Sequence, residues 1–138
     1  MRKRNDKKFD RIIDANFNRA KEGLRVCEDV CRFIFNKKSP TQNYKAVRHE
    51  LTEAISSLKI LKVIRSRDIG RDVGRKSISV EFKRSGAMDI FYANSQRVKE
   101  SIRVLEEFAK LRNNRLAEDL KKLRYKVYAL EKKVIERR

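Results

Sequence analysis

The chain has 138 residues, 37 of them basic and 19 acidic, which gives a net charge of +18. This length suits one domain with an ordinary core, so we expect a single domain over residues 1–138. No apolar run approaches the ~20 residues of a membrane span, and the basic N-terminus is not followed by the apolar stretch of a secretory signal. The sequence therefore predicts a soluble, cytoplasmic protein.

Four segments repeat apolar residues at steps of three and four: residues 9–36, 41–65, 87–112 and 115–137. This spacing gives each helix one apolar face, as the packed helices of a bundle require. Ser39 before Pro40 is typical of a helix start, and Asn113–Asn114 can end one helix and cap the next. Because both joints are short, we expect two helical hairpins. The predicted fold is an all-α four-helix bundle.

The chain contains an internal repeat. Residues 15–28 return as residues 93–106, with eight of fourteen positions identical at an offset of 78, and residues 45–49 return more weakly as 121–125. The repeat relates the first hairpin, about residues 9–65, to the second, about residues 87–137. Most of the identical positions are polar, which suggests polar groups held around a pseudo-symmetric cleft.

Residues 66–86 connect the two halves and lose the helical period. The connection holds three of the four glycines, and the alternation of polar and apolar residues over 77–82 indicates a short extended segment. Connections of this length are usually functional or disordered. Asp68 and Asp72, four apart among arginines and glycines, could bind Mg²⁺ together with substrate phosphates. The alternative is a set of surface Arg–Asp salt bridges.

Polar residues of the repeat are the other candidates for a site. Asn16 and Asn94 disfavour helix interiors, so each is expected to have a local role, either in binding or in fixing helix register. The duplicated pairs Arg19/Arg97 and Arg48/Arg124 suit phosphate or carboxylate. The alternative for these arginines is interhelical pairing with Glu28 and Glu106. Cys27 and Cys31 lie within an apolar helix face and are expected to be reduced core residues.

Several of these stretches resemble a known bacterial family. The resemblance covers roughly residues 9–133 and rests on residues 14–29 with 32–33, 47–51, 67–68 with 72–74, 93–94 with Arg97, Glu100, Arg103 and 105–108, and 123–125 with Tyr128 and 130–131. They are similar to the helical domain found alone or fused ahead of thiamine-phosphate synthase, the alternative hydroxymethylpyrimidine phosphate kinase family.

The resemblance implies a role in thiamine biosynthesis. It implies a kinase that converts 4-amino-5-hydroxymethyl-2-methylpyrimidine phosphate to the diphosphate with ATP and Mg²⁺. No synthase domain follows in this sequence, so we expect the chain to act alone or with a separate thiamine-phosphate synthase.

The positive charge leaves alternatives open. A basic helical bundle could bind nucleic acid, although the sequence has no recognisable reading motif. A non-catalytic docking partner of a thiamine-phosphate synthase is a third hypothesis. The sequence leaves the oligomeric state open, a homo-oligomer included.

For the kinase hypothesis, the predicted site lies where residues 67–74 meet the polar flanks of the first and third helices. Asp72 and Arg97 are the predicted catalytic residues, and Asp68 and Asp72 the predicted metal ligands. The predicted phosphate-binding and substrate-binding residues are Asn16, Arg19, Arg48, Arg67, Gly74 and Asn94.

Overall fold

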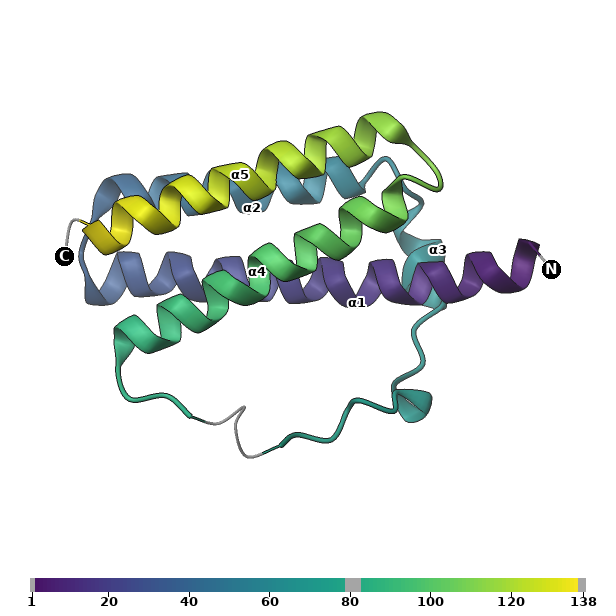
Figure 1. The fold of residues 1–138 in the computed structure, drawn as a ribbon, viewed down its shortest axis with the longest axis horizontal. Coiled ribbons are helices and arrows are strands. Elements are labelled where there is room, and N and C mark those ends of the chain that lie inside the picture. The colour runs from purple at the N-terminus through teal and green to yellow at the C-terminus, as the bar shows by residue number, and fades with distance from the viewer. Residues whose placement is uncertain (1, 79–82, 137–138) are drawn as a thin grey trace.

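Four long helices form the body of the molecule in the computed structural model, which describes residues 2–78 and 83–136 (Figure 1). They are α1 (Arg2–Asp29), α2 (Lys38–Ile55), α4 (Ala87–Ala109) and α5 (Asn114–Glu136). Helices α1 and α2 form one hairpin and α4 and α5 the other, while α1 also packs along α4 and α2 along α5. The prediction of an all-α bundle is confirmed.

The core follows the predicted apolar spacing. On α1, Ile13, Ala20, Leu24 and Cys27 are at most 1% exposed, and equivalent faces of the other helices close around them. The remaining long helices contribute Tyr44, Val47, Leu51 and Ile55 from α2, Phe91, Val98, Ile102 and Leu105 from α4, and Leu120, Leu123 and Val127 from α5. Cys27 and Cys31 are free, buried thiols, as expected.

The repeat also governs the buried ion pairs. Arg48 Nε of α2 donates to Glu28 Oε1 of α1 at 3.0 Å. At the equivalent positions of the second hairpin, Arg124 pairs with Glu106 through both carboxylate oxygens, one of them at 3.1 Å. Each hairpin is therefore joined by the same interhelical Arg–Glu contact, which agrees with a pseudo-two-fold relation between the halves.

The prediction of one continuous helix over residues 41–65 was wrong. It breaks after α2 and resumes as the short helix α3 (Ile60–Arg65). Ser56 and Ser57 lie at the break, and their hydroxyls donate to the carbonyls of Glu53 and Ala54. Serine side chains that bind nearby carbonyls compete with the helical ladder in this way.

Helix starts were predicted with mixed success. Asn113 Oδ1 accepts from the backbone N–H groups of Arg115 and Leu116, so it caps α5 as expected. Ser39 does not cap α2, because the helix already begins at Lys38 and residue 37, a lysine, makes no side-chain cap. The first hairpin differs also in ending α1 with a π-helical turn, η1 (Val30–Ile34).

The connection between the halves runs back along the bundle. Figure 1 shows it passing from the α3 end to the start of α4, bowed away from α1 and α4. It contains one short 3₁₀ helix, η2 (Ile69–Arg71), and residues 71–78 are exposed throughout. Of the predicted extended segment, residues 79–82 lie outside the described residues, and residues 77–78 are in neither helix nor strand.

No helix in the described ranges is both long enough and apolar enough to cross a membrane.

Candidate functional site

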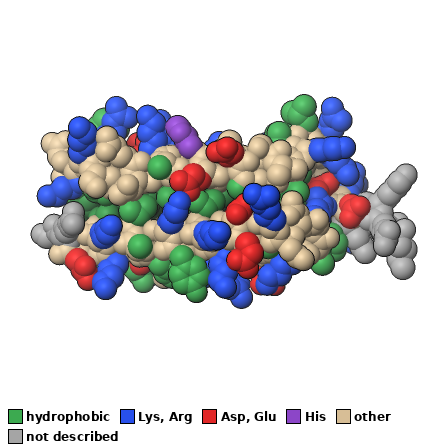
Figure 2. All heavy atoms as spheres, turned by 90° about the horizontal axis from the view of Figure 1, so that it is seen from above, with side chains coloured by type: hydrophobic (Ala, Val, Ile, Leu, Met, Phe, Trp, Pro, Cys, Tyr) green, Lys and Arg blue, Asp and Glu red, His purple; other side chains and the backbone are tan. Residues whose placement is uncertain are grey.

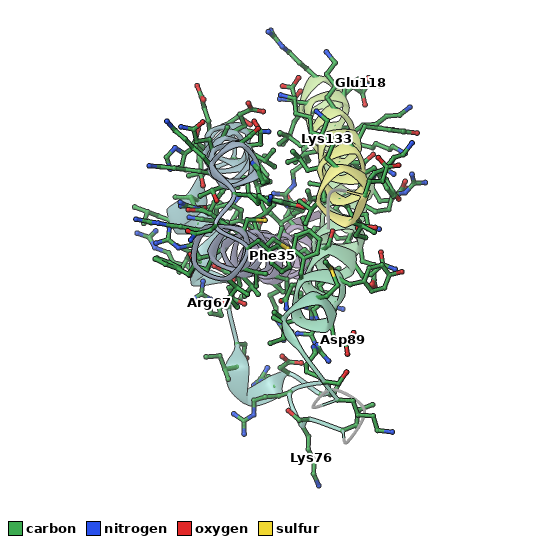
Figure 3. All side chains as sticks on the ribbon, turned by 90° about the vertical axis from the view of Figure 1, so that its left-hand side faces the viewer. Phe35, Arg67, Lys76, Asp89, Glu118 and Lys133 are labelled. Atoms are coloured by element: carbon green, nitrogen blue, oxygen red, sulfur yellow. The ribbon has the colours of Figure 1, made fainter. Side chains whose placement is uncertain are left out.

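An open cleft of about 410 Å³ lies where the connection leaves the bundle beside α1. Figure 3 shows Arg67 at this junction, while Lys76, near the middle of the connection, projects into solvent away from the bundle. The cleft is lined by Lys8, Arg11, Ile12, Asp14, Ala15, Asn16 and Arg19 of α1 and by Arg67, Asp68, Ile69 and Asp72 of the connection. Most of these side chains are charged, so the cleft suits a polar, charged ligand.

A bidentate ion pair fixes the connection to α1. Arg67 Nε and Nη2 donate to the two carboxylate oxygens of Asp14 at 2.7 and 2.8 Å. Asp14 is buried, and Asn18 Nδ2 also donates to it at 3.1 Å. The hydrogen bond with Asp14 raises the pKa of Arg67 above its ordinary value. A fork-to-fork pair of this kind sets orientation as well as distance, so Arg67 enters the cleft in a defined position.

The two carboxylates of the connection are held by local backbone contacts. Asp68 Oδ1 accepts from the N–H of Arg71 at 3.2 Å, and Asp72 Oδ1 accepts from the N–H of Gly74 at 3.0 Å. Asp72 Oδ2 has no hydrogen-bond partner among the residues described. Asp68 Oδ2 forms an ion pair with the exposed side chain of Arg71 at 3.5 Å, as the salt-bridge alternative for this segment predicted. Both aspartates line the cleft, and Asp72 is the one whose second carboxylate oxygen has no partner there.

Two carboxylates match the way Mg²⁺ is usually bound, through one or two acidic side chains with substrate phosphates and water completing the shell. Within residues 2–78 and 83–136 there is no group of three or more metal-ligating side chains. Asp68 and Asp72 thus fit a magnesium ion that arrives with a phosphorylated ligand, rather than one held by the protein alone.

Two arginines of the cleft, Arg11 and Arg19, have no acidic partner among the residues described. Arg19 is exposed, and its one hydrogen bond goes to Asn16 Oδ1 at 3.5 Å. Arg11 reaches only the backbone carbonyl of Asp68, also at 3.5 Å. Neither arginine forms a salt bridge with the residues described. Unpaired guanidinium groups beside a cleft favour a ligand that brings its own negative charge.

Five of the predicted site residues meet in this cleft: Asn16, Arg19, Arg67, Asp68 and Asp72. Asn16 is buried and its Nδ2 donates to the Ile12 carbonyl of its own helix at 2.9 Å. The hydrogen bonds of Asn16 stay within α1, so it does not join two helices as the register hypothesis required.

The other predicted residues, Arg48, Gly74, Asn94 and Arg97, do not line the cleft. Arg48 is engaged with Glu28, as the alternative hypothesis for this arginine predicted. Gly74 contributes its N–H to Asp72. Asn94 and Arg97 belong to α4, which packs against α1.

Sequence reasoning missed Lys8, Arg11 and Asp14 as cleft residues. One signal was available: Asp10 and Asp14 are four apart and therefore share a helix face. Both are buried, and each faces an arginine from a distant segment, Arg112 for Asp10 and Arg67 for Asp14.

Two further hollows lie at opposite ends of the α2/α5 groove, which Figure 2 shows as an apolar strip between two ridges. One, of about 550 Å³, is lined by residues of mixed charge such as Glu50, Asp119 and Lys122. The other, of about 510 Å³, has an apolar floor and three lysines: Lys37, Lys38 and Lys133. They lack the predicted Asn, Arg and Asp residues, so the cleft beside α1 is the stronger candidate.

Comparison with known families gives a match to the ThiD2 family over residues 11–133. The chain belongs to the ThiD2 family. The match spans both hairpins and the connection, so every cleft residue except Lys8 falls within the family's boundaries.

Curated relatives of this ThiD2 chain carry the name thiamine-phosphate synthase. The protein from Synechocystis sp. is 39% identical over 122 residues, covering 88% of this chain and 34% of the relative. The protein from Rhodopirellula baltica is 38% identical over 120 residues, covering 86% and 32%. That from Prochlorococcus marinus subsp. pastoris is 34% identical over 130 residues, covering 94% and 36%.

The chain thus spans about a third of the length of these relatives. No solved structure matches the chain.

Proposed function

We propose that this chain takes part in thiamine biosynthesis as a kinase that phosphorylates hydroxymethylpyrimidine phosphate to the diphosphate, with ATP as co-substrate. The family membership and the names of the relatives support the pathway. The observation that carries the activity is the cleft beside α1, where arginines without acidic partners and two carboxylates face the same space.

Catalysis of phosphoryl transfer depends on positioning the reactants and neutralising their charge more than on a strong nucleophile from the protein. An oxygen of the pyrimidine's phosphate forms a bond to the γ-phosphorus of ATP, and the bond from that phosphorus to the β-phosphate oxygen breaks, releasing ADP. Arg19 and Arg67 would hold phosphate oxygens, and Asp14 would keep Arg67 in place.

Asp68 and Asp72 are the residues that would hold Mg²⁺, which supplies charge neutralisation for the phosphates when it is bound. Asn16 Nδ2 is committed to the Ile12 carbonyl, so Asn16 would contact the ligand through Oδ1, which accepts from Arg19 at 3.5 Å and can accept a second hydrogen bond.

A thermal-shift screen separates this proposal from its rivals. Stabilisation by pyrimidine phosphate and by Mg-ATP is expected, since a ligand that binds only the folded state raises the melting temperature. Stabilisation by nucleic acid alone would favour a nucleic-acid-binding protein. Stabilisation only by a separate thiamine-phosphate synthase would favour a docking partner.

Substitution of Asp72 tests the site directly. Asp72→Asn keeps size and shape and removes one negative charge, so the protein should fold while kinase turnover falls by at least ~10²-fold, a typical scale for losing a positioned charge. The control is Asp119→Asn, which changes an exposed carboxylate of the α2/α5 hollow and should leave turnover unchanged. Wild-type turnover in a folded Asp72→Asn variant would place the chemistry elsewhere.

A further inference from the structure

The internal repeat builds a second Asn/Arg pair on α4, and its asparagine makes the same backbone contact as the asparagine on α1. Asn94 Nδ2 donates to the Ile90 carbonyl at 2.8 Å, as Asn16 Nδ2 donates to the Ile12 carbonyl at 2.9 Å. Arg97, like Arg19, is exposed. The repeat therefore reproduces the backbone contact of the asparagine and the exposure of the arginine, while the hydrogen bond from Arg19 to Asn16 has no counterpart on α4 among the residues described.

Most duplicated arginines are used within the protein. Arg48 and Arg124 pair with buried glutamates, and Arg25 and Arg103 each form a salt bridge four residues along their own helix, with Asp29 and Glu107. Over the ranges that the structure describes, the duplicated pair without a salt bridge is Arg19/Arg97. The paired arginines stabilise the fold through their salt bridges. Arg19 and Arg97 have no such role, so we attribute their duplication to ligand binding.

The two arginines flank one contact between helices. Helices α1 and α4 run antiparallel (Figure 1), and they approach so closely at Gly23 that a Cβ there would lie 2.6 Å from Val98 Cγ2 and 3.1 Å from the Asn94 carbonyl oxygen. Arg97 precedes Val98, and Arg19 lies about one turn, ~6 Å, from Gly23 along α1. Arg19 and Arg97 are thus near neighbours along the α1/α4 seam.

Symmetry places both arginines on the same side of this helix pair. The pseudo-two-fold axis that relates the halves exchanges α1 with α4 and α2 with α5. It therefore runs perpendicular to the layer formed by α1 and α4 and to the layer formed by α2 and α5. Rotation about such an axis keeps directions along the axis unchanged. A side chain on α1 that points away from α2 and α5 is therefore related to a side chain on α4 that points the same way. Arg19 faces the connection, and Arg97 therefore belongs to that face.

We propose that each half of this face binds one of two phosphorylated substrates. The α1 half, with Lys8, Arg11, Arg19 and the carboxylates Asp68 and Asp72, takes the more highly charged Mg-nucleotide. The α4 half, with Asn94 and Arg97, takes the monophosphate of the pyrimidine. The inference rests on the kinase function proposed above, and it explains why both halves of the repeat keep the same Asn and Arg.

Two substrates bound in this way would meet at the seam. Their phosphates would lie between Arg19 and Arg97, where the γ-phosphoryl group passes from the nucleotide to the phosphate oxygen of the pyrimidine. Orienting two reactants side by side is the part of phosphoryl transfer that a protein contributes most directly.

Calorimetric titration of variants in the two halves tests the division. Wild-type protein, Arg19→Ala and Arg97→Ala are titrated with a magnesium complex of a non-hydrolysable ATP analogue and, separately, with 4-amino-5-hydroxymethyl-2-methylpyrimidine phosphate. Arg19→Ala should weaken nucleotide binding at least ~10-fold, the scale of one charge-assisted hydrogen bond, and leave pyrimidine phosphate binding within about 2-fold. Arg97→Ala should show the opposite pattern.

Arg25→Ala and Arg103→Ala are the matched controls, since they remove exposed arginines related by the same repeat but paired with acids. They should change neither affinity. If Arg19→Ala and Arg97→Ala weaken the same ligand, or neither ligand, the assignment of separate halves is overturned while the kinase function stands. If wild-type protein binds neither ligand, the kinase function is overturned with it.

Discussion

Glu28 and Glu106 are buried carboxylates at equivalent positions of the repeat, and each is neutralised by an arginine from the neighbouring helix of its hairpin. A buried charge is tolerated only when a partner and hydrogen bonds compensate for the water it loses. The hydrogen bond to Glu106 raises the pKa of Arg124, so the arginine is charged at any ordinary pH. These two pairs are part of the fold, which is why Arg48 is unavailable to a ligand.

Breaking one pair should be costly for stability. Glu106→Gln keeps the shape of the side chain but leaves the charge of Arg124 buried and uncompensated, so the free energy of unfolding should fall by about 3 kcal/mol. Urea denaturation followed by circular dichroism measures the loss. The control is the adjacent Glu107→Gln, which removes an exposed carboxylate and should change stability by less than ~0.5 kcal/mol. Equal losses in the two variants would contradict the structural role of the pair.

For the cleft, the sequence predicted which residues line it more successfully than which residues pair with one another. Asn16, Arg19, Arg67, Asp68 and Asp72 were predicted because packing does not explain them, and the structure brings all five together. The pairing of Asp14 with Arg67 was not predicted, because it joins residues 53 positions apart. Helical periodicity says which face a carboxylate occupies but not which distant arginine the folded chain brings to that face.

At the level of elements, periodicity predicted the four long helices, while local side-chain chemistry decided their ends. Apolar spacing continues through residues 41–65, so it could not reveal the break at Ser56 and Ser57, where hydroxyls bind the backbone carbonyls. Asn113 caps α5 as predicted, whereas the equivalent start of α2 carries Lys37 and no side-chain cap. The connection has no period of its own, so its course along α1 could not be predicted from spacing.

The packing of α1 on α4 depends on Gly23. In an isolated helix Gly→Ala is favourable by about 1 kcal/mol, but here the new Cβ would meet Val98 Cγ2 at 2.6 Å and the Asn94 carbonyl at 3.1 Å. Val98 is fully buried and stiff, and the carbonyl is backbone, so the helices must separate. Overpacking typically costs 1–3 kcal/mol, and we expect Gly23→Ala to lower the free energy of unfolding by about 1 kcal/mol net.

A double-mutant cycle provides the control for Gly23. Val98→Ala removes the methyl group that the new Cβ meets, so Gly23→Ala should cost less in that background than in the wild type. Chemical denaturation of the four proteins gives the coupling energy. If Gly23→Ala stabilises the wild-type protein, the close approach of α1 and α4 is not a constraint on this position.

On the scale of the whole molecule, the net charge of +18 is spread widely. Figure 2 shows Lys and Arg side chains interspersed with Asp and Glu over the face formed by α2 and α5, rather than gathered in one patch. A nucleic-acid-binding face usually concentrates its cations along a groove or helix. The uncompensated arginines of the candidate site suit a small phosphorylated ligand, while the remaining charge gives long-range attraction for anions in general.

This distribution predicts weak, unselective binding to duplex DNA. At physiological salt the dissociation constant should be in the non-specific range, about 10⁻⁴–10⁻⁶ M, and the affinity should fall steeply as salt displaces the phosphate contacts. Fluorescence anisotropy with two duplexes of unrelated sequence, measured across a salt series, provides the test. The two duplexes should bind alike, because contacts to phosphate carry no information about sequence.

Free pyrimidine phosphate at a concentration that saturates the candidate site serves as the control, and it should leave duplex binding largely unchanged. Selective binding of one sequence near 10⁻⁸ M at physiological salt, the strength of a specific protein–DNA complex, would contradict the kinase proposal and favour a nucleic-acid-binding protein.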